Sequence, residues 1–175
     1  MTSTEPARRW ERPLYIFAKP PPASLPDLAR LRAGLGIQSR YALDRLHSTF
    51  LPLGDSTPET IGAARAILEA FHAEPFHVAF DHVEGVTLKP RKGLRAPGAF
   101  QRGLAGHFAA SGFGLPAYGF GLHLNLDYGT APDRRAAIAP LGWPVDEILL
   151  IESAYGRHIV HGRRSLEVRQ YALAL

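Results

Sequence analysis

Two short segments of the chain each place a histidine two residues before a side chain that can donate a hydrogen bond. The first segment contains His47 and Thr49, and the second contains His123 and Asn125. If both segments are strands, each histidine stands beside its partner, because side chains at i and i+2 of a strand share a face. Histidine can hold or release a proton near neutral pH, which suits general acid and base catalysis.

A pair of imidazoles on one ligand would suit phosphodiester chemistry. One neutral histidine takes a proton from the attacking oxygen, and one protonated histidine gives a proton to the leaving oxygen. The neighbouring Thr49 and Asn125 could donate hydrogen bonds to phosphoryl oxygens as negative charge develops. This chemistry needs no metal, so His47 and His123 are the candidate catalytic residues and Thr49 and Asn125 the candidate phosphate-binding residues.

The two segments also continue in a similar way. Gly54 and Pro58 follow the first, and Gly129 and Pro132 follow the second, at offsets of 74 to 76 residues between the copies. A pattern of strand, glycine turn and proline-started helix that occurs twice indicates a duplicated lobe; chance similarity is the alternative. Two lobes related by a pseudo-twofold axis could bring the two histidines together across a groove.

The rest of the pattern supplies the elements that must position these residues. Apolar runs and alternation predict strands at 13–18, 45–51, 76–83, 118–128, 147–153 and 166–173. Caps and helical spacing predict helices from 24 to 34 or 36, over 57–73, over 100–110, and after Pro132. We interpret 86–99 as irregular and basic, and 157–164 as a basic turn. Because strands and helices mix without regular alternation, we expect an α+β fold with two pseudo-twofold-related lobes of antiparallel sheet plus helices.

Composition limits the other possibilities. The chain has 175 residues, a formal net charge of +4 and no cysteine, which excludes a disulfide scaffold, a thiolate metal site and a cysteine nucleophile. We expect a loose N-terminal tail at 1–12 and a single domain at 13–175. No apolar run approaches the roughly 20 residues that span a bilayer, so we expect a cytoplasmic protein without a membrane partner. No cofactor is expected, and the oligomeric state stays open.

The chain resembles the 2H phosphoesterase superfamily, in particular 2′-5′ RNA ligase and 2′,3′-cyclic phosphodiesterase proteins. The anchors of the resemblance are His47-Ser48-Thr49-Phe50, His123-Leu124-Asn125-Leu126, and Trp143 followed by 147–153. The resemblance implies a bilobal α+β fold, an acid–base pair of His47 and His123, and a phosphate held by Thr49. It further implies metal-independent opening of cyclic phosphates on RNA ends or nucleotides, with 2′-5′ ligation of RNA ends as a related activity.

The second motif departs from the family pattern. Asn125 stands where the family usually has threonine or serine, and Leu122 where proline often precedes the histidine. The alternative is therefore a non-catalytic protein of the same fold that binds RNA ends or nucleotides. His158 and His161 resemble a metal-binding pair, but they have no third ligand nearby in sequence, and we expect no metal site. Two groups of basic residues could either bind a nucleic-acid backbone or be solvated loop charge: Lys89, Arg91, Lys92 and Arg95, and Arg157, Arg163 and Arg164.

Overall fold

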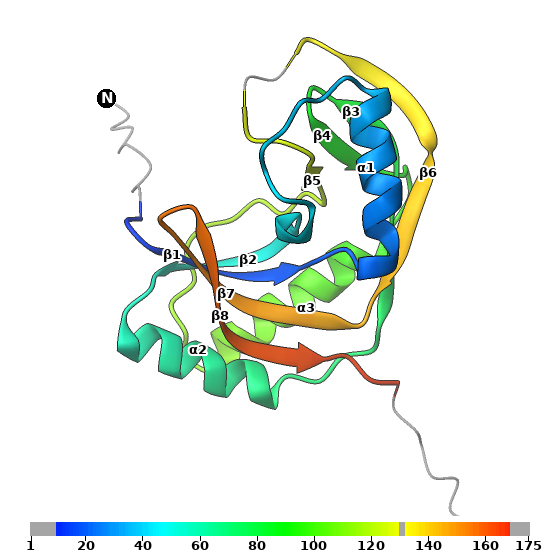
Figure 1. The fold of residues 1–175 in the computed structure, drawn as a ribbon. Coiled ribbons are helices and arrows are strands. Elements are labelled where there is room, and N and C mark those ends of the chain that lie inside the picture. The colour runs from blue at the N-terminus through cyan, green and yellow to red at the C-terminus, as the bar shows by residue number, and fades with distance from the viewer. Residues whose placement is uncertain (1–9, 130–131, 169–175) are drawn as a thin grey trace, which may run out of the picture.

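The computed structural model describes residues 10–129 and 132–168. These residues form two four-stranded antiparallel sheets and three α-helices (Figure 1). Sheet A has the order β2 (Ser48–Asp55), β1 (Pro13–Ala18), β7 (Glu147–Ala154) and β8 (Arg157–Ser165). Sheet B has the order β5 (Leu124–Asn125), β4 (Thr87–Pro90), β3 (Phe76–Glu84) and β6 (Arg135–Val145). The helices are α1 (Leu25–Gly34), α2 (Pro58–Ala70) and α3 (Ala96–Ala110), with short 3₁₀ turns at Pro22–Ser24 and Leu43–Arg45.

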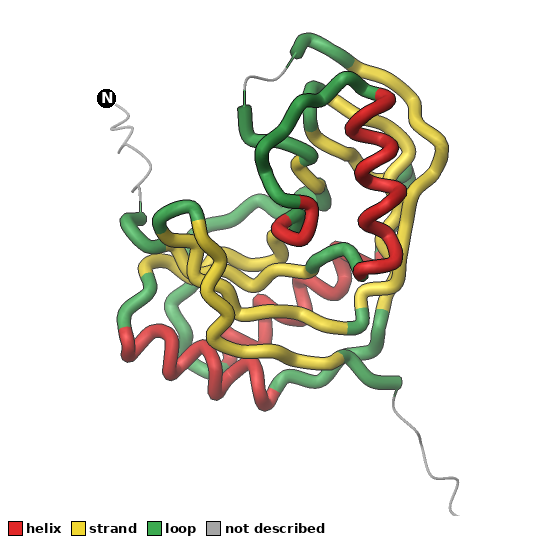
Figure 2. Tube along the Cα trace, viewed as in Figure 1, coloured by secondary structure: helices red, strands yellow, loops and turns green. Residues whose placement is uncertain are grey.

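The two central strands of sheet A, β1 and β7, are buried on both faces, which explains why they are continuous apolar runs in the sequence. Leu14 and Ile16 of β1 are fully buried in the main core. Helices α2 and α3 pack on one side of this sheet (Figure 2). On the other face Phe17, Leu149 and Ile151 form a separate small apolar cluster. That second cluster lies beneath the cavity described below.

Sheet B has one apolar and one polar face. Val83, Leu88 and Leu124 lie opposite one another on adjacent strands and are fully buried in the main core. Thr87 and Asn125 lie opposite each other on the other face. Sheet B therefore presents polar side chains on the same face as the second histidine motif.

Helix α2 begins where the sequence predicts. The side chain of Thr57 accepts a hydrogen bond of 3.1 Å from the backbone N–H of Thr60. Pro58 occupies the first helical turn, where its missing N–H carries no penalty, and Glu59 lies near the positive end of the helix dipole. The expected cap, proline and acidic residue are all in place.

Several expected elements are wrong. The strand expected over 45–51 begins only at Ser48, after the 3₁₀ turn that ends at Arg45. The helix predicted after Pro132 is absent, and the chain instead forms β6 from Arg135 onward. The basic turn over 157–164 is strand β8, and the strand over 118–128 shortens to the two residues of β5. The irregular segment 86–99 contains β4 and the start of α3. The errors at β6 and β8 share a cause, since both are edge strands whose partners β3 and β7 supply the pairing that local sequence does not signal.

The expected N-terminal tail and the expected last strand can be compared with the structure only in part. Residues 1–9 of the expected tail lie outside the described residues, as do 169–173 of the strand expected over 166–173. Leu166–Val168 are described and do not form a strand. Within the described part of the chain, no helix combines the length and apolar character needed to cross a membrane.

The close approach of β6 to β3 leaves no room for a side chain at Gly142. A Cβ atom at this position would lie 2.5 Å from the backbone oxygen of Val78, which is held in the β3–β6 ladder. We expect Gly142→Ala to lower the free energy of unfolding by about 1–3 kcal/mol, as overpacking does. The matched control is Gly103→Ala in α3, where the added methyl meets no atom within 4 Å. That variant should gain about 0.5–1 kcal/mol because alanine replaces a mid-helix glycine. Urea denaturation measures both, and equal shifts would contradict the packing argument.

Candidate active site

A cavity of about 440 Å³ lies where the two sheets meet, and both histidine motifs line it. His47, Thr49, His123 and Asn125 all contribute to its wall, so the four residues singled out in the sequence are brought together. The remaining lining residues are mostly aromatic or basic: Tyr15, Phe17, Tyr41, Arg45, Tyr118, Tyr128, Ser153 and His158.

Each histidine directly precedes an edge strand of its sheet. His47 precedes β2, and His123 precedes β5. The hydroxyl of Ser48 donates a 2.7 Å hydrogen bond to the backbone carbonyl of His123, which ties the two motifs together. Ser48 is buried and interrupts an otherwise apolar face of the strand. Its position is explained by this contact, because a buried hydroxyl needs a partner.

The two imidazoles are held in the same way. Nδ1 of His47 lies 2.9 Å from the carbonyl oxygen of Arg45, and Nδ1 of His123 lies 2.7 Å from the carbonyl oxygen of Gly121. A carbonyl oxygen only accepts, so each Nδ1 carries the hydrogen and donates it. When the ring is neutral, Nε2 therefore keeps its lone pair. The hydroxyl of Tyr128 lies 3.4 Å from Nε2 of His47.

The surroundings of His47 favour its neutral form. Its ring stacks on Phe17, with 3.7 Å between the ring centroids and 19° between the planes. Burial lowers the pKa of His47 from 6.5 to about 4, against the backbone hydrogen bond to Arg45, which raises it. The positive charges of Lys19, His123 and Arg45 lower the pKa further. His47 is therefore an unprotonated base at neutral pH.

A third imidazole in the cavity was missed in the sequence. The ring of His158 on β8 lies 5.0 Å from the ring of His47, and its Nε2 lies 3.5 Å from the hydroxyl of Tyr41. Burial lowers the pKa of His158 to about 4, and the charges of His47, Arg45 and Lys19 add to the effect. The available signal was Tyr155-Gly156, whose φ angles of 50° and 69° form the two-residue turn of the β7–β8 hairpin. Recognising that turn would have made 157–165 a strand and placed His158 opposite Ser153.

His158 and His161 do not form a pair. Whereas His158 lines the cavity, Nε2 of His161 lies 2.8 Å from a carboxylate oxygen of the buried Glu152. Glu152 also pairs with Arg12 at 2.5 Å. Among the described residues, no group of three or more histidine, cysteine, aspartate or glutamate side chains is arranged to hold a metal ion.

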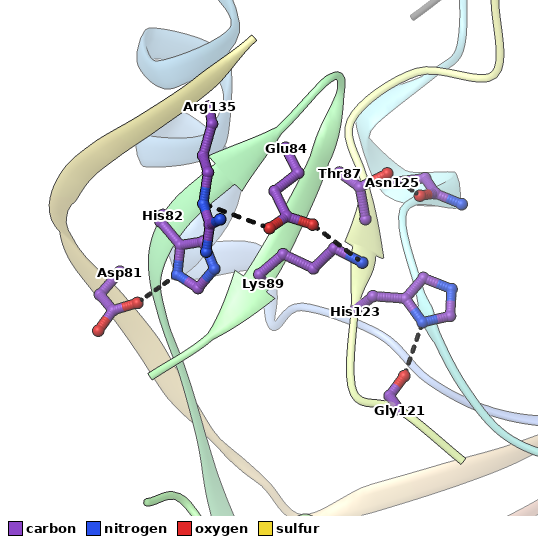
Figure 3. A network of polar contacts seen from close by, with 9 residues as sticks. All are labelled: Asp81, His82, Glu84, Thr87, Lys89, Gly121, His123, Asn125 and Arg135. Carbon is purple, nitrogen blue, oxygen red and sulfur yellow. Dashed lines mark hydrogen bonds and ion pairs between the residues drawn. The ribbon is translucent and has the colours of Figure 1, made fainter. Parts of the chain in front are cut away.

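The amide of Asn125 is oriented by a neighbour on β4. The hydroxyl of Thr87 donates a 2.7 Å hydrogen bond to Oδ1 of Asn125 (Figure 3). This contact occupies the acceptor side of the amide and leaves its NH₂ group as a donor. Asn125 is thus held in the orientation in which it could contact an anion in the cavity.

A second group that sequence reasoning missed is the aromatic and cationic part of the cavity wall, formed by Tyr41, Arg45 and Tyr128. The guanidinium carbon of Arg45 lies 4.6 Å from the centre of the Tyr41 ring, within the range of a cation–π contact. Tyr41 packs against Tyr128 with 4.7 Å between ring centroids, and burial raises the pKa of Tyr41 to about 12. Both tyrosines therefore keep their protons at neutral pH. Arg45 adds a fixed positive charge to the cavity wall.

The lowered pKa values of the half-buried His47 and His158 predict that the free energy of unfolding decreases in acid. His47 and His158 stay neutral in the folded protein down to about pH 4, whereas in the unfolded chain they take up protons near the ordinary value of 6.5. The unfolded state therefore binds more protons as the pH falls from 6.5 to 4, and the free energy of unfolding decreases over that window. His158→Phe removes one of the two groups and should make the decrease smaller. Urea denaturation across this range measures it, and an unchanged decrease in the variant would be evidence against the assignment.

Comparison with known proteins bears on the fold. No protein-family model matches the sequence, and a search of curated proteins finds no match. Among solved structures, E. coli LigT in complex with 3′-AMP is 20% identical, with 89% of this chain and 98% of that chain covered and a TM-score of 0.71. A structure described as a phosphoesterase is 20% identical, with 90% and 99% covered and a TM-score of 0.70.

A third similar structure is TT0787 of Thermus thermophilus, which is 15% identical, with 90% and 100% covered and a TM-score of 0.69. Similarity at this level of identity concerns the arrangement of the backbone over almost the whole of each chain. The α+β fold expected from the sequence is confirmed, and the chain has the same fold as E. coli LigT.

Proposed function

We propose that this protein is a metal-independent phosphodiesterase that opens 2′,3′-cyclic phosphates on RNA ends or nucleotides, with 2′-5′ ligation of RNA ends, in which a 5′-hydroxyl replaces water as the nucleophile, as a related activity. The observation that carries the proposal is the matched pair of imidazoles in one cavity. Each ring donates from Nδ1 to the carbonyl two residues earlier, so each can exchange a proton through Nε2. Solved structures of E. coli LigT in complex with 3′-AMP, ATP and phosphate support a nucleotide or phosphate as the ligand class.

The two histidines take different roles. His47 is unprotonated because burial lowers its pKa to about 4, so it serves as the base that accepts a proton from the attacking water. The water oxygen forms a new bond to phosphorus while the bond from phosphorus to one ribose oxygen breaks. His123 supplies the proton that the leaving ribose oxygen takes up. The product is a ribose phosphomonoester, and proton exchange with solvent returns both rings to their starting states.

Three groups on the cavity wall stabilise the charge that builds on the phosphoryl oxygens. The hydroxyl of Thr49 and the NH₂ group of Asn125 donate hydrogen bonds, and Arg45 contributes positive charge. Asn125 replaces the hydroxyl residue typical of the family with a longer donor. Thr87 fixes that longer side chain, so the substitution is compatible with turnover.

The histidine pair is tested by His47→Ala and His123→Ala, each assayed on a nucleoside 2′,3′-cyclic phosphate in the presence of EDTA. Each variant should lose roughly 10²–10⁴-fold in kcat, the usual contribution of one general acid or base. His77→Ala, an exposed histidine on β3, is the matched control. Near-normal turnover in either active-site variant would refute the pair, and ligand binding without turnover in the wild-type protein would favour the non-catalytic alternative.

The same assay separates the two roles when it is run as a function of pH. We expect a bell-shaped profile of kcat/KM whose acidic limb reflects His47, with an apparent pKa near 4 instead of 6.5. An acidic limb near the ordinary value would mean that His47 is not the base.

The role of Thr87 gives a separate prediction. Thr87→Val keeps the shape of the side chain but removes the hydroxyl that holds Asn125, so kcat should fall about tenfold through the loss of a positioned donor. Thr87→Ser keeps the hydroxyl and should retain most of the rate. In an Asn125→Ala background, Thr87→Val should have no further effect, which a double-mutant cycle measures. Additive losses would show that Thr87 does not act through Asn125.

A further inference from the structure

The polar face of sheet B continues away from the second histidine motif. In the antiparallel pairing of β4 with β5, Thr87 stands opposite Asn125. Lys89 lies two residues beyond Thr87 on β4, so its side chain is on the same face as that of Thr87. The pairing of β4 with β5 ends at Leu88 and Leu124, and His123 directly precedes Leu124, so Lys89 and His123 lie at the same end of this pairing. Lys89 lies outside the cavity lining, where it could meet the part of a ligand that extends from His123 over sheet B.

The ammonium group of Lys89 is only loosely engaged. Its nearest carboxylate is that of Glu84, at 3.7 Å, and the other oxygen of Glu84 lies 3.5 Å from Arg135. Figure 3 shows Glu84 between these two cations. The Lys89 side chain is 36% exposed, and ion pairs of this length between exposed groups contribute little. Lys89 can therefore turn to another anion while Arg135 still neutralises Glu84.

The two carboxylates near this position are both engaged elsewhere. Asp81 contacts Nδ1 of His82, which lies opposite Lys89 on β3, at 2.7 Å. Glu84 is shared between Lys89 and Arg135, so the Lys89 ammonium can reach another anion without leaving either carboxylate unpartnered. A flexible ammonium group beside a phosphate site suits a second phosphate, which it can bind as a point charge.

We propose that Lys89 forms a second phosphate subsite beside the His123–Asn125 motif, and that the protein favours ligands that carry a further phosphate next to the cyclic one. The inference rests on the proposed function, because it takes the position of the reacting phosphate from that proposal. A 5′-phosphate on a mononucleotide and the preceding phosphodiester of an RNA end both supply such a group. The two sources share one chemistry and differ in the length of the ligand.

The experiment compares three substrates: a nucleoside 2′,3′-cyclic phosphate, its 5′-phosphorylated derivative, and a dinucleotide that ends in the cyclic phosphate. The wild-type protein should show a higher kcat/KM for at least one of the two substrates with a second phosphate. Lys89→Met should reduce that preference about tenfold, the size of effect expected from one charge-assisted contact. Lys92→Met, which removes an exposed lysine in the turn after β4, is the matched control and should leave the preference intact.

Each outcome has a defined meaning. Loss of preference for the dinucleotide alone assigns the subsite to an RNA backbone, and loss for the 5′-phosphorylated nucleotide alone assigns it to a mononucleotide. Equal effects of Lys89→Met on all three substrates, or no effect, would overturn the subsite.

If the wild-type protein turns over none of the substrates, the proposed function fails and the subsite is tested by binding. Calorimetry then compares a nucleoside 2′-phosphate with a nucleoside 2′,5′-bisphosphate in the wild-type protein and in Lys89→Met. A tighter Kd for the bisphosphate that Lys89→Met removes would support the subsite. Equal Kd values for the two ligands, or no binding of either, would overturn it.

Discussion

The hydrogen bond from the Ser48 hydroxyl to the carbonyl of His123 is the contact on which the geometry of the cavity depends. It joins the edge strand of sheet A to the edge strand of sheet B at the residues where these two strands begin, next to the two histidines. Both ends of the bond are adjacent to the imidazoles, so the bond fixes the two motifs locally, in addition to the apolar core that the two sheets share. A buried hydroxyl and carbonyl would each lose a partner if the sheets moved apart, which disfavours an opened arrangement.

Burial makes protonation of His47 unfavourable, and the same burial gives the cavity a neutral imidazole. His47 stacks on Phe17, and the cluster of Phe17, Leu149 and Ile151 supports that stack from within sheet A. Excluding water from one side of the ring keeps His47 neutral and fixes its orientation at once. The lowered pKa of His47 therefore has two consequences: the folded protein is less stable in acid, and the imidazole stays unprotonated at neutral pH.

The sequence was informative where a signal is local and poor where it depends on a partner strand. The helix start at Thr57-Pro58-Glu59 and the buried strands at 13–18 and 147–153 were predictable, because caps and continuous apolar runs act within a few residues. Strands β6 and β8 were not, since each is an edge strand rich in polar or small residues whose pairing is supplied by another segment. Missing β8 also hid His158.

The sequence could single out four residues that line one cavity because the i, i+2 spacing occurs in both motifs, although each histidine lies just before its strand and β5 is only two residues long. Their roles stay a prediction. Arg45, Tyr41 and Tyr128 could not be found, because Arg45 ends a short 3₁₀ turn and the two tyrosines lie in loops, none of which has a periodicity that marks it. The Asn125 amide could be named from the sequence, but its orientation depends on Thr87, 38 positions away.

Because β5 is short, fewer ladder hydrogen bonds hold one side of the cavity than the other. His47 directly precedes β2, a strand of eight residues that pairs along its length with β1. His123 directly precedes β5, a strand of two residues that is held to β4 and to Ser48 by a few hydrogen bonds. Segments with so few ladder bonds open at a small fraction of the free energy of global unfolding. Local opening should therefore be concentrated on the His123 side of the cavity, while the floor formed by sheet A stays fixed.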